Sequence, residues 1–443
     1  MHPCVDTMPQ PLLVTVQRNT KRQSRAINMT RHLSRILTGL ASVAALAATL
    51  SHPAAAQQVF PVPPTPPLEP KNDAFYTSPS DVELGAVAPG TVLRYREINA
   101  KAYYLFPVKG QAWQLMYRST DHKGRAVAMV GTVLLPDNAP AANRQLMAYN
   151  VAYDALTLRC APSYEFVKGT ALEQALIQTA LKNGLVVMSP DYEGLKSLWT
   201  VGLNSGHGVL DGIRAAENFN PAGLNGASTP VVITGYSGGA IAANWANELY
   251  RSYAPELNIK GVAAGGVAVD LGNIARKVDG GFWAGVYFGA VAALANGYPE
   301  VGVATLTNDK GKTMLAKAQN MCLGQFLTGA PDPLLNFAFQ KMSSNTTVPQ
   351  LLDVPAVKRI IAENRLGQRT PGAPVYIYEG TVDELMPVAD VDALVKKYCD
   401  QGVKVQYSRT YNDHLLLAVT GFGKAFAYLQ DRLNDVPAPA NCK

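Results

Sequence analysis

The stretch Pro230-Val-Val-Ile-Thr-Gly-Tyr-Ser-Gly-Gly-Ala-Ile-Ala-Ala-Asn-Trp245 decides the fold that this sequence predicts. Its first half is a short apolar, β-branched run typical of a buried strand, and its second half has the composition of a helix. Between them lies Gly235-Tyr-Ser237-Gly-Gly239, a G-x-S-x-G motif. In this context the motif predicts a sharp strand-to-helix turn that exposes the serine Oγ. Side chains at Gly235 and Gly239 would collide inside such a turn, so the two glycines agree with this interpretation.

A serine at such a turn is a candidate nucleophile. The helix N-terminus behind Ser237 offers backbone N–H groups and the positive end of the helix dipole to a developing oxyanion. Gly238, the residue after the serine, is the natural donor. The motif alone is weak evidence in a chain with 37 glycines, and a structural Gly-rich turn is the alternative. The strand before the motif and the helix after it favour the nucleophile.

The chain order that accompanies this turn is Ser, then Asp or Glu, then His, and this order selects a general base. His414, in Tyr411-Asn-Asp-His414, follows the last predicted strand and is the expected base. His122 lies in a polar turn and is expected to be solvated. His207 precedes the serine, so it could shape the site but cannot be its base.

A carboxylate must hold the histidine in the correct tautomer. Asp383 follows the predicted strand Pro374-Val-Tyr-Ile-Tyr-Glu-Gly380 by three residues, on a loop at the carboxyl end of that strand, and is the expected acid. Glu384 is the fallback, and Asp413 is expected to point away because it adjoins His414. The remaining candidates between Ser237 and His414 are Asp353, Asp390 and Asp400.

Strand-like and helical runs alternate along the chain. Strands are predicted at 126–135, 145–153, 184–189, 231–235, 259–269, 374–379 and 403–410. Helices are predicted at 171–182, 208–218, 240–253 and 356–365. This alternation predicts an α/β fold with a mostly parallel, doubly wound sheet that binds ligands at the carboxyl ends of its strands. Residues 270–365, roughly, are too long for one crossover and are expected to form an inserted, mainly helical subdomain.

The first 56 residues have the pattern of a secretory signal peptide. Arg31 and Arg35 precede an apolar run, residues 36–50, which ends at small residues before Gln57, and translation could begin at Met29. An uncleaved membrane anchor is the alternative, although the run is short for a span. A Pro-rich leader, residues 57–72, then precedes the main domain, residues 73–443. The predicted signal peptide indicates an exported protein, either extracellular or periplasmic.

The charge balance and the cysteine content indicate which ligands and cross-links to expect. After the first 56 residues, the chain contains 33 basic and 32 acidic side chains. This balance does not predict electrostatic binding to nucleic acid. Four cysteines remain (Cys160, Cys322, Cys399 and Cys442), which in an exported chain indicates two disulfides with three connectivities. Buried free thiols are the alternative. No Cys/His cluster has metal-ligand spacing, so no metal site is expected.

The chain resembles the secretory lipases, the lipase-A type of α/β-hydrolase found in yeasts and bacteria. The resemblance spans residues 73–430, roughly, and rests on the elbow and on phrases in family order. Those phrases are Asp73-Ala-Phe-Tyr76, Pro89-Gly-Thr-Val-Leu-Arg94, Ala152-Tyr-Asp154, Cys160-Ala-Pro-Ser163, Ser189-Pro-Asp-Tyr-Glu-Gly194 and Val209-Leu-Asp-Gly-Ile-Arg-Ala-Ala216. It implies an α/β-hydrolase fold, a triad of Ser237, Asp383 and His414, and an oxyanion hole of the Gly238 and Asp154 N–H groups. It also implies a lid over an acyl tunnel and the disulfides Cys160–Cys322 and Cys399–Cys442.

The expected function is therefore a secreted serine hydrolase of carboxylic esters, with triacylglycerols as the first substrate class and an acyl-enzyme on Ser237. No cofactor is needed, and the expected partners are the ester substrate and, transiently, a lipid interface. The apolar segment 282–294 could cover an acyl pocket, or simply be a buried helix. The alternatives are an esterase for short-chain, plant-wall or polymeric esters, an acyltransferase, and a non-catalytic binding protein. The sequence predicts no anchor after processing and no particular oligomeric state.

Overall fold

A computed structural model describes residues 57–442 apart from 103–105, 138–142, 172 and 323–335. The predicted signal segment, residues 1–56, lies outside the described residues. No helix in the described part of the chain is long and apolar enough to cross a bilayer.

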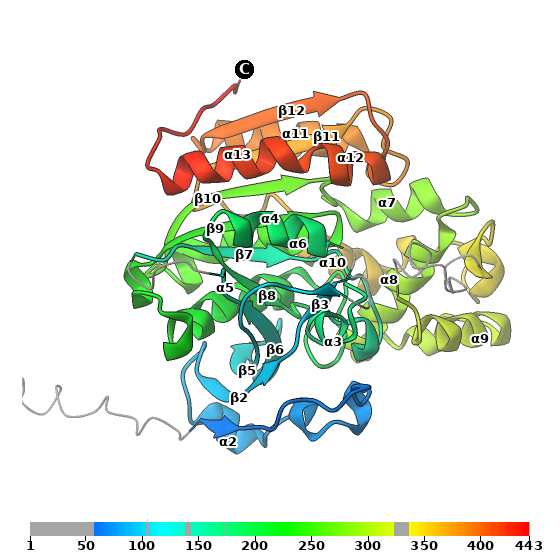
Figure 1. The fold of residues 1–443 in the computed structure, drawn as a ribbon. Coiled ribbons are helices and arrows are strands. Elements are labelled where there is room, and N and C mark those ends of the chain that lie inside the picture. The colour runs from blue at the N-terminus through cyan, green and yellow to red at the C-terminus, as the bar shows by residue number, and fades with distance from the viewer. Residues whose placement is uncertain (1–56, 103–105, 138–142, 172, 323–335, 443) are drawn as a thin grey trace, which may run out of the picture. The chain divides into compact units, whose positions relative to one another are not determined.

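A ten-stranded sheet forms the centre of the molecule, in the order β1-β2-β5-β6-β8-β7-β9-β10-β11-β12 (Figure 1). Its strands are β1 Gln58–Val59, β2 Val92–Ile98, β5 Ala112–Thr120, β6 Ala126–Leu134, β7 Leu146–Asn150, β8 Val186–Pro190, β9 Pro230–Tyr236, β10 Asn258–Gly265, β11 Val375–Gly380 and β12 Val405–Thr410. A separate ribbon pairs β3 Lys101–Ala102 with β4 Phe106–Pro107. The six strands from β8 to β12 in this order are parallel, which confirms the predicted mostly parallel sheet. The antiparallel part, β2 with β5, β5 with β6 and β6 with β8, includes two strands that the sequence analysis did not predict, β2 and β5.

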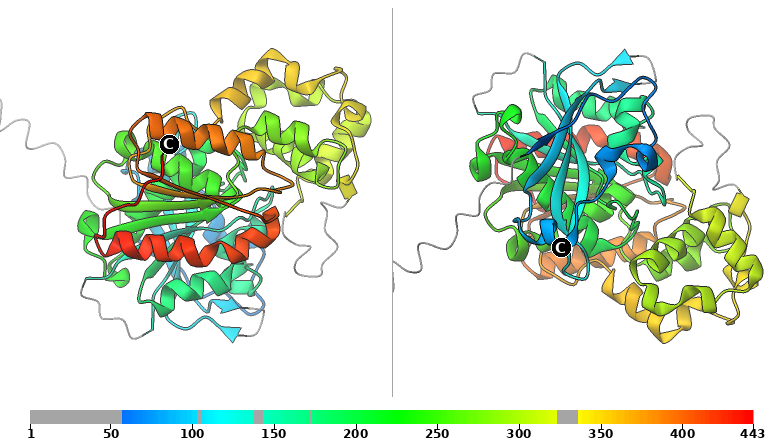
Figure 2. Two further views of the ribbon diagram at one scale, coloured as in Figure 1. Left: turned by 90° about the horizontal axis from the view of Figure 1, so that it is seen from above. Right: turned by 90° about the horizontal axis from the view of Figure 1, so that it is seen from below.

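Helices cover both faces of the sheet. Figure 2 shows α13 (Phe422–Leu433) and α11 (Val388–Asp400) on opposite faces. With α13 lies α4 (Gln174–Lys182), and with α11 lie α5 (Gly202–Glu217) and α6 (Gly238–Tyr253). From opposite faces, α13 and α6 pack on β9, whose Val231, Val232 and Ile233 are fully buried. The six parallel strands from β8 to β12 all end at the same edge, so the loops after them meet there.

A helical insertion separates β10 from β11, although these two strands are neighbours in the sheet. Its helices are α7 Leu271–Val278, α8 Ala284–Gly297, α9 Asp309–Ala318 and α10 Pro355–Glu363, and they lie beside the carboxyl edge of the parallel strands (Figure 1). Among its described residues none joins the main sheet. Asp270 and Arg365 form an ion pair between the beginning and the end of the insertion. Shorter helices of the main domain are α2 Asp81–Gly85, α3 Pro162–Lys168 and α12 His414–Thr420.

The Pro-rich leader packs along the edge of the sheet. β1 pairs with β2 in parallel, the Phe60 N–H donates to the Tyr95 carbonyl (2.8 Å), and the Phe60 ring packs edge-on against Phe75. Prolines cannot donate to a ladder, which restricts such a segment to an edge position.

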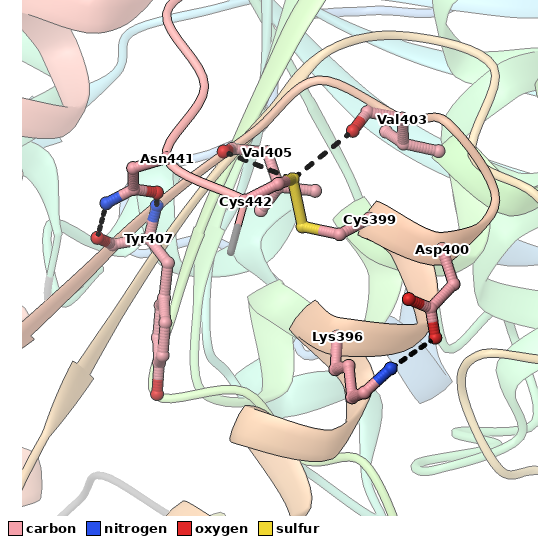
Figure 3. Close-up of a disulfide and its surroundings, with 8 residues drawn as sticks. All are labelled: Lys396, Cys399, Asp400, Val403, Val405, Tyr407, Asn441 and Cys442. Atoms are coloured by element: carbon pink, nitrogen blue, oxygen red, sulfur yellow. Dashed lines mark hydrogen bonds and ion pairs between the residues drawn. A yellow bond between two sulfur atoms is a disulfide. The ribbon is translucent and has the colours of Figure 1, made fainter.

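The two disulfides have the predicted pairing. Cys160–Cys322 joins the main domain to the insertion, and Cys399–Cys442 joins the end of α11 to the C-terminal segment. Figure 3 shows the second bond beside Asn441, whose side chain donates to the Tyr407 carbonyl and accepts from the Tyr407 N–H. These contacts cover part of the open edge of β12, an edge that would otherwise expose unpaired backbone groups.

Removing the second disulfide is expected to destabilise the protein without changing its fold. Cys399 and Cys442 are 43 residues apart, and closing a loop of this length stabilises a protein by about 2–4 kcal/mol. The double variant Cys399→Ser/Cys442→Ser should lose that amount in urea unfolding. The control Lys396→Ala breaks the neighbouring exposed ion pair with Asp400 and should cost less than about 0.5 kcal/mol. Equal unfolding free energies for the double variant and the parent would contradict this account.

Candidate active site

Ser237 lies at the turn between β9 and α6 with a left-handed backbone, φ 53° and ψ −118°. A residue with a side chain seldom adopts positive φ, and its surroundings must hold it there. A Cβ at Gly235 would lie 2.2 Å from the Gly239 carbonyl oxygen, and a Cβ at Gly239 would lie 2.0 Å from the Asn150 carbonyl oxygen. Both distances are far below van der Waals contact. The turn therefore requires glycine at both positions.

His414 is buried, and its ring joins the serine to an acid. Its Nε2 is 2.8 Å from Ser237 Oγ, and its Nδ1 is 2.6 Å from Asp383 Oδ2. A carboxylate only accepts, so Nδ1 carries the proton and Nε2 is free to accept from the serine hydroxyl. The backbone of His414 is held from two sides: its N–H donates to Glu384 Oε2 (2.9 Å), and its carbonyl accepts from the Tyr236 hydroxyl (2.6 Å).

Asp383 lies three residues after β11 and is also buried. Its Oδ1 accepts from the N–H groups of Leu385 (2.8 Å) and Met386 (2.6 Å), while Oδ2 accepts from His414. Burial acts to raise the pKa of Asp383, but the hydrogen bond and charge of His414 outweigh burial and lower the pKa. The carboxylate is therefore anionic at neutral pH and oriented toward the imidazole.

The other predicted acid candidates are engaged elsewhere. Glu384 holds the backbone of His414, and Asp413 is the N-cap of α12, where it accepts from the Leu416 N–H. The other three have partners outside the site: Asp353 with Lys358, Asp390 with Asn273, and Asp400 with Lys396. Of the six candidates, the structure places only Asp383 against the imidazole.

Within the described part of the chain, the two histidines besides His414 are packing residues. His122 is half-buried: its Nε2 is 2.9 Å from the Gly297 carbonyl oxygen and its ring packs on Tyr298. The prediction that His122 is solvated is wrong, because the helical insertion covers this turn. His207 stacks on Tyr253, and burial lowers its pKa to about 4, so it is neutral.

Asp154 and Gly238 meet beside Ser237. Asp154 follows β7 with a left-handed φ of 37°, and a Cβ at Gly238 would lie 1.6 Å from Asp154 Oδ1. Neither backbone N–H has a hydrogen-bond partner within the described part of the chain. The Gly238 N–H belongs to the first turn of α6, where helix N–H groups have no partner in the helix. Two unpaired donors are thus present beside the serine.

A half-buried glutamate, Glu173, and a buried one, Glu193, hold the loop that carries Asp154. The Ala152 N–H donates to Glu173 Oε1 (2.7 Å), and the Ala155 N–H donates to Glu193 Oε2 (3.2 Å). Burial raises the pKa of both glutamates. Burial also raises the pKa of Asp154 to about 7. At pH 7 an Asp154 carboxyl with this pKa is about half protonated, which reduces the negative charge beside the two donors.

A mostly apolar pocket of about 40 Å³ lies next to Ser237. Its polar lining is Asp154, Trp199, Thr200 and Ser237. Helices α7 and α8 of the insertion supply much of its apolar lining: Leu271, Ile274, Ala275, Val286, Tyr287 and Ala290. The segment 282–294 therefore both packs as a helix and lines the pocket.

The sequence did not predict Tyr236, Glu173 or Glu193 as site residues, and it offered Glu384 only as a fallback acid. Glu193 had a local signal, because it stands two residues after Asp191 in a segment that continues a fully buried strand, β8. A charged residue in such a position is buried only with partners. Tyr236 and Glu173 had no comparable signal, since their partners are distant in the sequence.

Comparison with known proteins gives a consistent result. The family model for secretory lipases matches residues 165–441. A Mycobacterium tuberculosis protein named "Probable inactive lipase" is 35% identical over 384 residues, which cover 84% of each chain. Lipase A of Arthroderma benhamiae is 34% identical over 409 residues, 87% of this chain and 84% of the relative. Candida antarctica lipase A, solved in its closed state, superposes with a TM-score of 0.77 at 29% identity, covering 85% of this chain and 89% of that one. These similarities confirm the predicted α/β-hydrolase fold.

Substitution of Gly239 is expected to damage the elbow directly. The added Cβ of Gly239→Ala would have to displace the Asn150 backbone, so the free energy of unfolding should fall by about 2–4 kcal/mol. The matched control is Gly423→Ala in α13, where an added Cβ meets nothing within 4 Å. That change should be neutral or stabilising by up to about 1 kcal/mol. Urea unfolding measures both, and equal stabilities for the two variants would show that the elbow tolerates a side chain.

Proposed function

This chain belongs to the secretory lipase family, and from that premise we propose that it is a secreted serine hydrolase of carboxylic esters whose main substrates are triacylglycerols. One observation supports the catalytic part above all. Ser237, His414 and Asp383 form a continuous hydrogen-bonded chain, at 2.8 Å and 2.6 Å, beside an apolar pocket and two unpaired N–H donors.

The proposed reaction proceeds through an acyl-enzyme. His414 Nε2 takes the proton of Ser237 as Oγ attacks the ester carbonyl, and Asp383 stabilises the resulting imidazolium. The imidazolium then gives its proton to the departing alcohol. Water repeats these steps on the acyl-serine and releases the fatty acid. The steps use side chains and backbone groups only, without a cofactor.

The N–H groups of Gly238 and Asp154 are proposed to hold the oxyanion. Donors that are already oriented when charge develops commonly contribute about 3–4 kcal/mol each to the transition state. Glu173 and Glu193 support this role, because they fix the loop on either side of Asp154. The positive end of α6 acts on the same oxygen.

Two features favour a lipid substrate. The pocket beside Ser237 is mostly apolar, which suits an acyl chain. In addition, five large apolar side chains near His414 are exposed, and we call them the α12 apolar surface. They are Val382, Tyr411, Leu415, Leu416 and Val419. Clustered exposed apolar groups mark a contact surface, and here the contact would be the lipid aggregate that contains the substrate.

The two disulfides support export, since such bonds persist in oxidising compartments. An esterase for short-chain, plant-wall or polymeric esters, or an acyltransferase, would use the same triad. A non-catalytic protein is the further alternative, given the name of the mycobacterial relative. The intact hydrogen-bonded chain in this protein argues against that alternative.

Replacement of the nucleophile tests the proposal. Ser237→Ala should lower kcat on p-nitrophenyl esters by about 10⁴-fold or more and abolish labelling by a fluorophosphonate, with a thermal midpoint within about 2 °C of the parent. Initial rates on C2 to C16 esters and on emulsified triolein distinguish the substrate classes. Activity restricted to C2–C4 esters would exclude a triacylglycerol lipase, and an unlabelled parent protein would exclude a serine hydrolase.

The α12 apolar surface is expected to matter only at an interface. Leu416→Ser/Val419→Ser removes two apolar side chains that are 52% and 67% exposed, and the rate on emulsified triolein should fall about 10-fold. The rate on soluble p-nitrophenyl butyrate should stay within about twofold. The control Val82→Ser changes an 83% exposed valine on α2 and should leave both rates unchanged. A parallel loss on both substrates would assign these residues to the folded site instead of the interface.

A further inference from the structure

Glu379, the fifth residue of β11, is a second buried carboxyl beside Asp383 that the reaction steps above do not use. It is fully buried. Its Oε2 accepts from the Val267 N–H (3.0 Å), while Oε1 has no N–H or neutral O–H donor among the described residues. The two carboxyl groups, Glu379 and Asp383, are in hydrogen-bond contact.

Two carboxyl groups in contact and away from water cannot both be ionised, so they share one proton. The donors around the pair show where this proton belongs. Asp383 accepts from Leu385, Met386 and His414, so its charge is well solvated by the protein. Glu379 accepts from fewer donors, the backbone N–H groups of Val267 and Gly380, and from no imidazole. The proton therefore stays on Glu379, on the oxygen that otherwise has no partner.

We propose that Glu379 is a positioning residue of the active site, which keeps its proton and donates it from Oε1 as a hydrogen bond to the carboxylate of Asp383. This inference rests on the proposed function, because it assigns Asp383 to the triad. The neutral acid would fix the rotamer of Asp383. It would also keep Asp383 a weak base, so the proton taken from Ser237 stays on the imidazole.

The electrostatic surroundings agree with this assignment. Burial and the charge of Asp383 raise the pKa of Glu379 to about 9. The titratable groups around the pair are Tyr236 on β9, Tyr378 on β11, Asp383 and Glu384 on the loop after β11, Tyr407 on β12 and His414 on α12. Burial raises the pKa of each of these tyrosines, so they remain neutral. Glu379 is thus protonated through the neutral range and ionises near pH 9.

Ionisation of Glu379 would impair catalysis by disturbing the position of Asp383. The hydrogen bond to Asp383 would be replaced by repulsion between two buried carboxylates. The wild-type kcat/KM should therefore fall about 10-fold between pH 8 and pH 10, with an apparent pKa near 9.

The variant Glu379→Gln distinguishes the effect of the hydrogen-bond donor from the effect of a negative charge at this position. An amide can donate to Asp383 and accept from Val267 at every pH, so this variant should keep neutral-pH activity within about threefold and lose the alkaline fall. Glu379→Met has similar length but no donor, and its kcat at pH 7 should fall about 10-fold with KM unchanged. The matched control is Glu217→Gln on α5, where burial raises the carboxyl pKa to about 8 outside the site. That variant should keep the wild-type profile.

The rates are measured on p-nitrophenyl butyrate from pH 6 to 10.5, with spontaneous hydrolysis subtracted. An alkaline fall in Glu379→Gln equal to that of the wild type would overturn the inference. So would a loss at pH 7 as large in Glu379→Gln as in Glu379→Met, because a neutral donor would then be insufficient.

Thermal unfolding provides a measurement that does not need activity. A group whose pKa is raised by folding costs stability as pH rises from its unfolded value toward its folded value, here from about 4.5 to about 9. Glu379→Gln lacks this cost, so its midpoint relative to wild type should increase from pH 5 to pH 9. A constant difference would show that Glu379 is ionised and would overturn the inference. An inactive wild type, in contrast, would refute the proposed function. The thermal midpoints would still show whether Glu379 is protonated in the folded protein.

Discussion

The left-handed backbone of Ser237, enclosed between β9 and α6, is the constraint on which the rest of the site depends. Gly239 lies so close to the Asn150 carbonyl that no side chain fits between them. The end of β7 is therefore in contact with the elbow, and the chain that leaves β7 reaches Asp154 four residues later. The Ser237 N–H also donates to the Gly265 carbonyl at the end of β10. Three adjacent strands thus position Ser237, the proposed nucleophile, and the proposed oxyanion donors together.

Buried and half-buried carboxyl groups organise the irregular loops of the site. Loop backbone lacks the ladder that satisfies N–H groups in strands, and a buried N–H without a partner is costly. Here acidic side chains accept from those N–H groups: Glu173 from Ala152, Glu193 from Ala155, Glu379 from Val267, Asp383 from Leu385 and Met386, and Glu384 from His414. Each acid thereby obtains a donor and each loop a fixed conformation. The abundance of acid around a site for ester chemistry is thus a consequence of how its loops are held.

The helical insertion contacts both halves of the site. Its Cys322 pairs with Ala155 in an isolated bridge and is bonded to Cys160, next to the loop of Asp154. On the other side, the Lys277 ammonium of α7 donates to the carbonyls of Asp383 (2.6 Å) and Met386 (2.9 Å). A displacement of α7 therefore breaks contacts with the loop that carries the acid. The cover of the pocket and the triad are mechanically connected.

The sequence by itself determined the elbow, the order Ser237, Asp383, His414 and the parallel strands, because these features are local patterns or follow from order along the chain. The sequence did not predict the antiparallel strands β2 and β5, and it predicted a solvated His122. The elements that pair with these strands or cover this histidine lie far away in the sequence. Only the tertiary structure decided which acids meet which loops, as for Glu173, Glu384 and Glu379. A glutamate has no periodicity or neighbour that reveals a buried partner, since that contact exists only after distant strands and helices have packed.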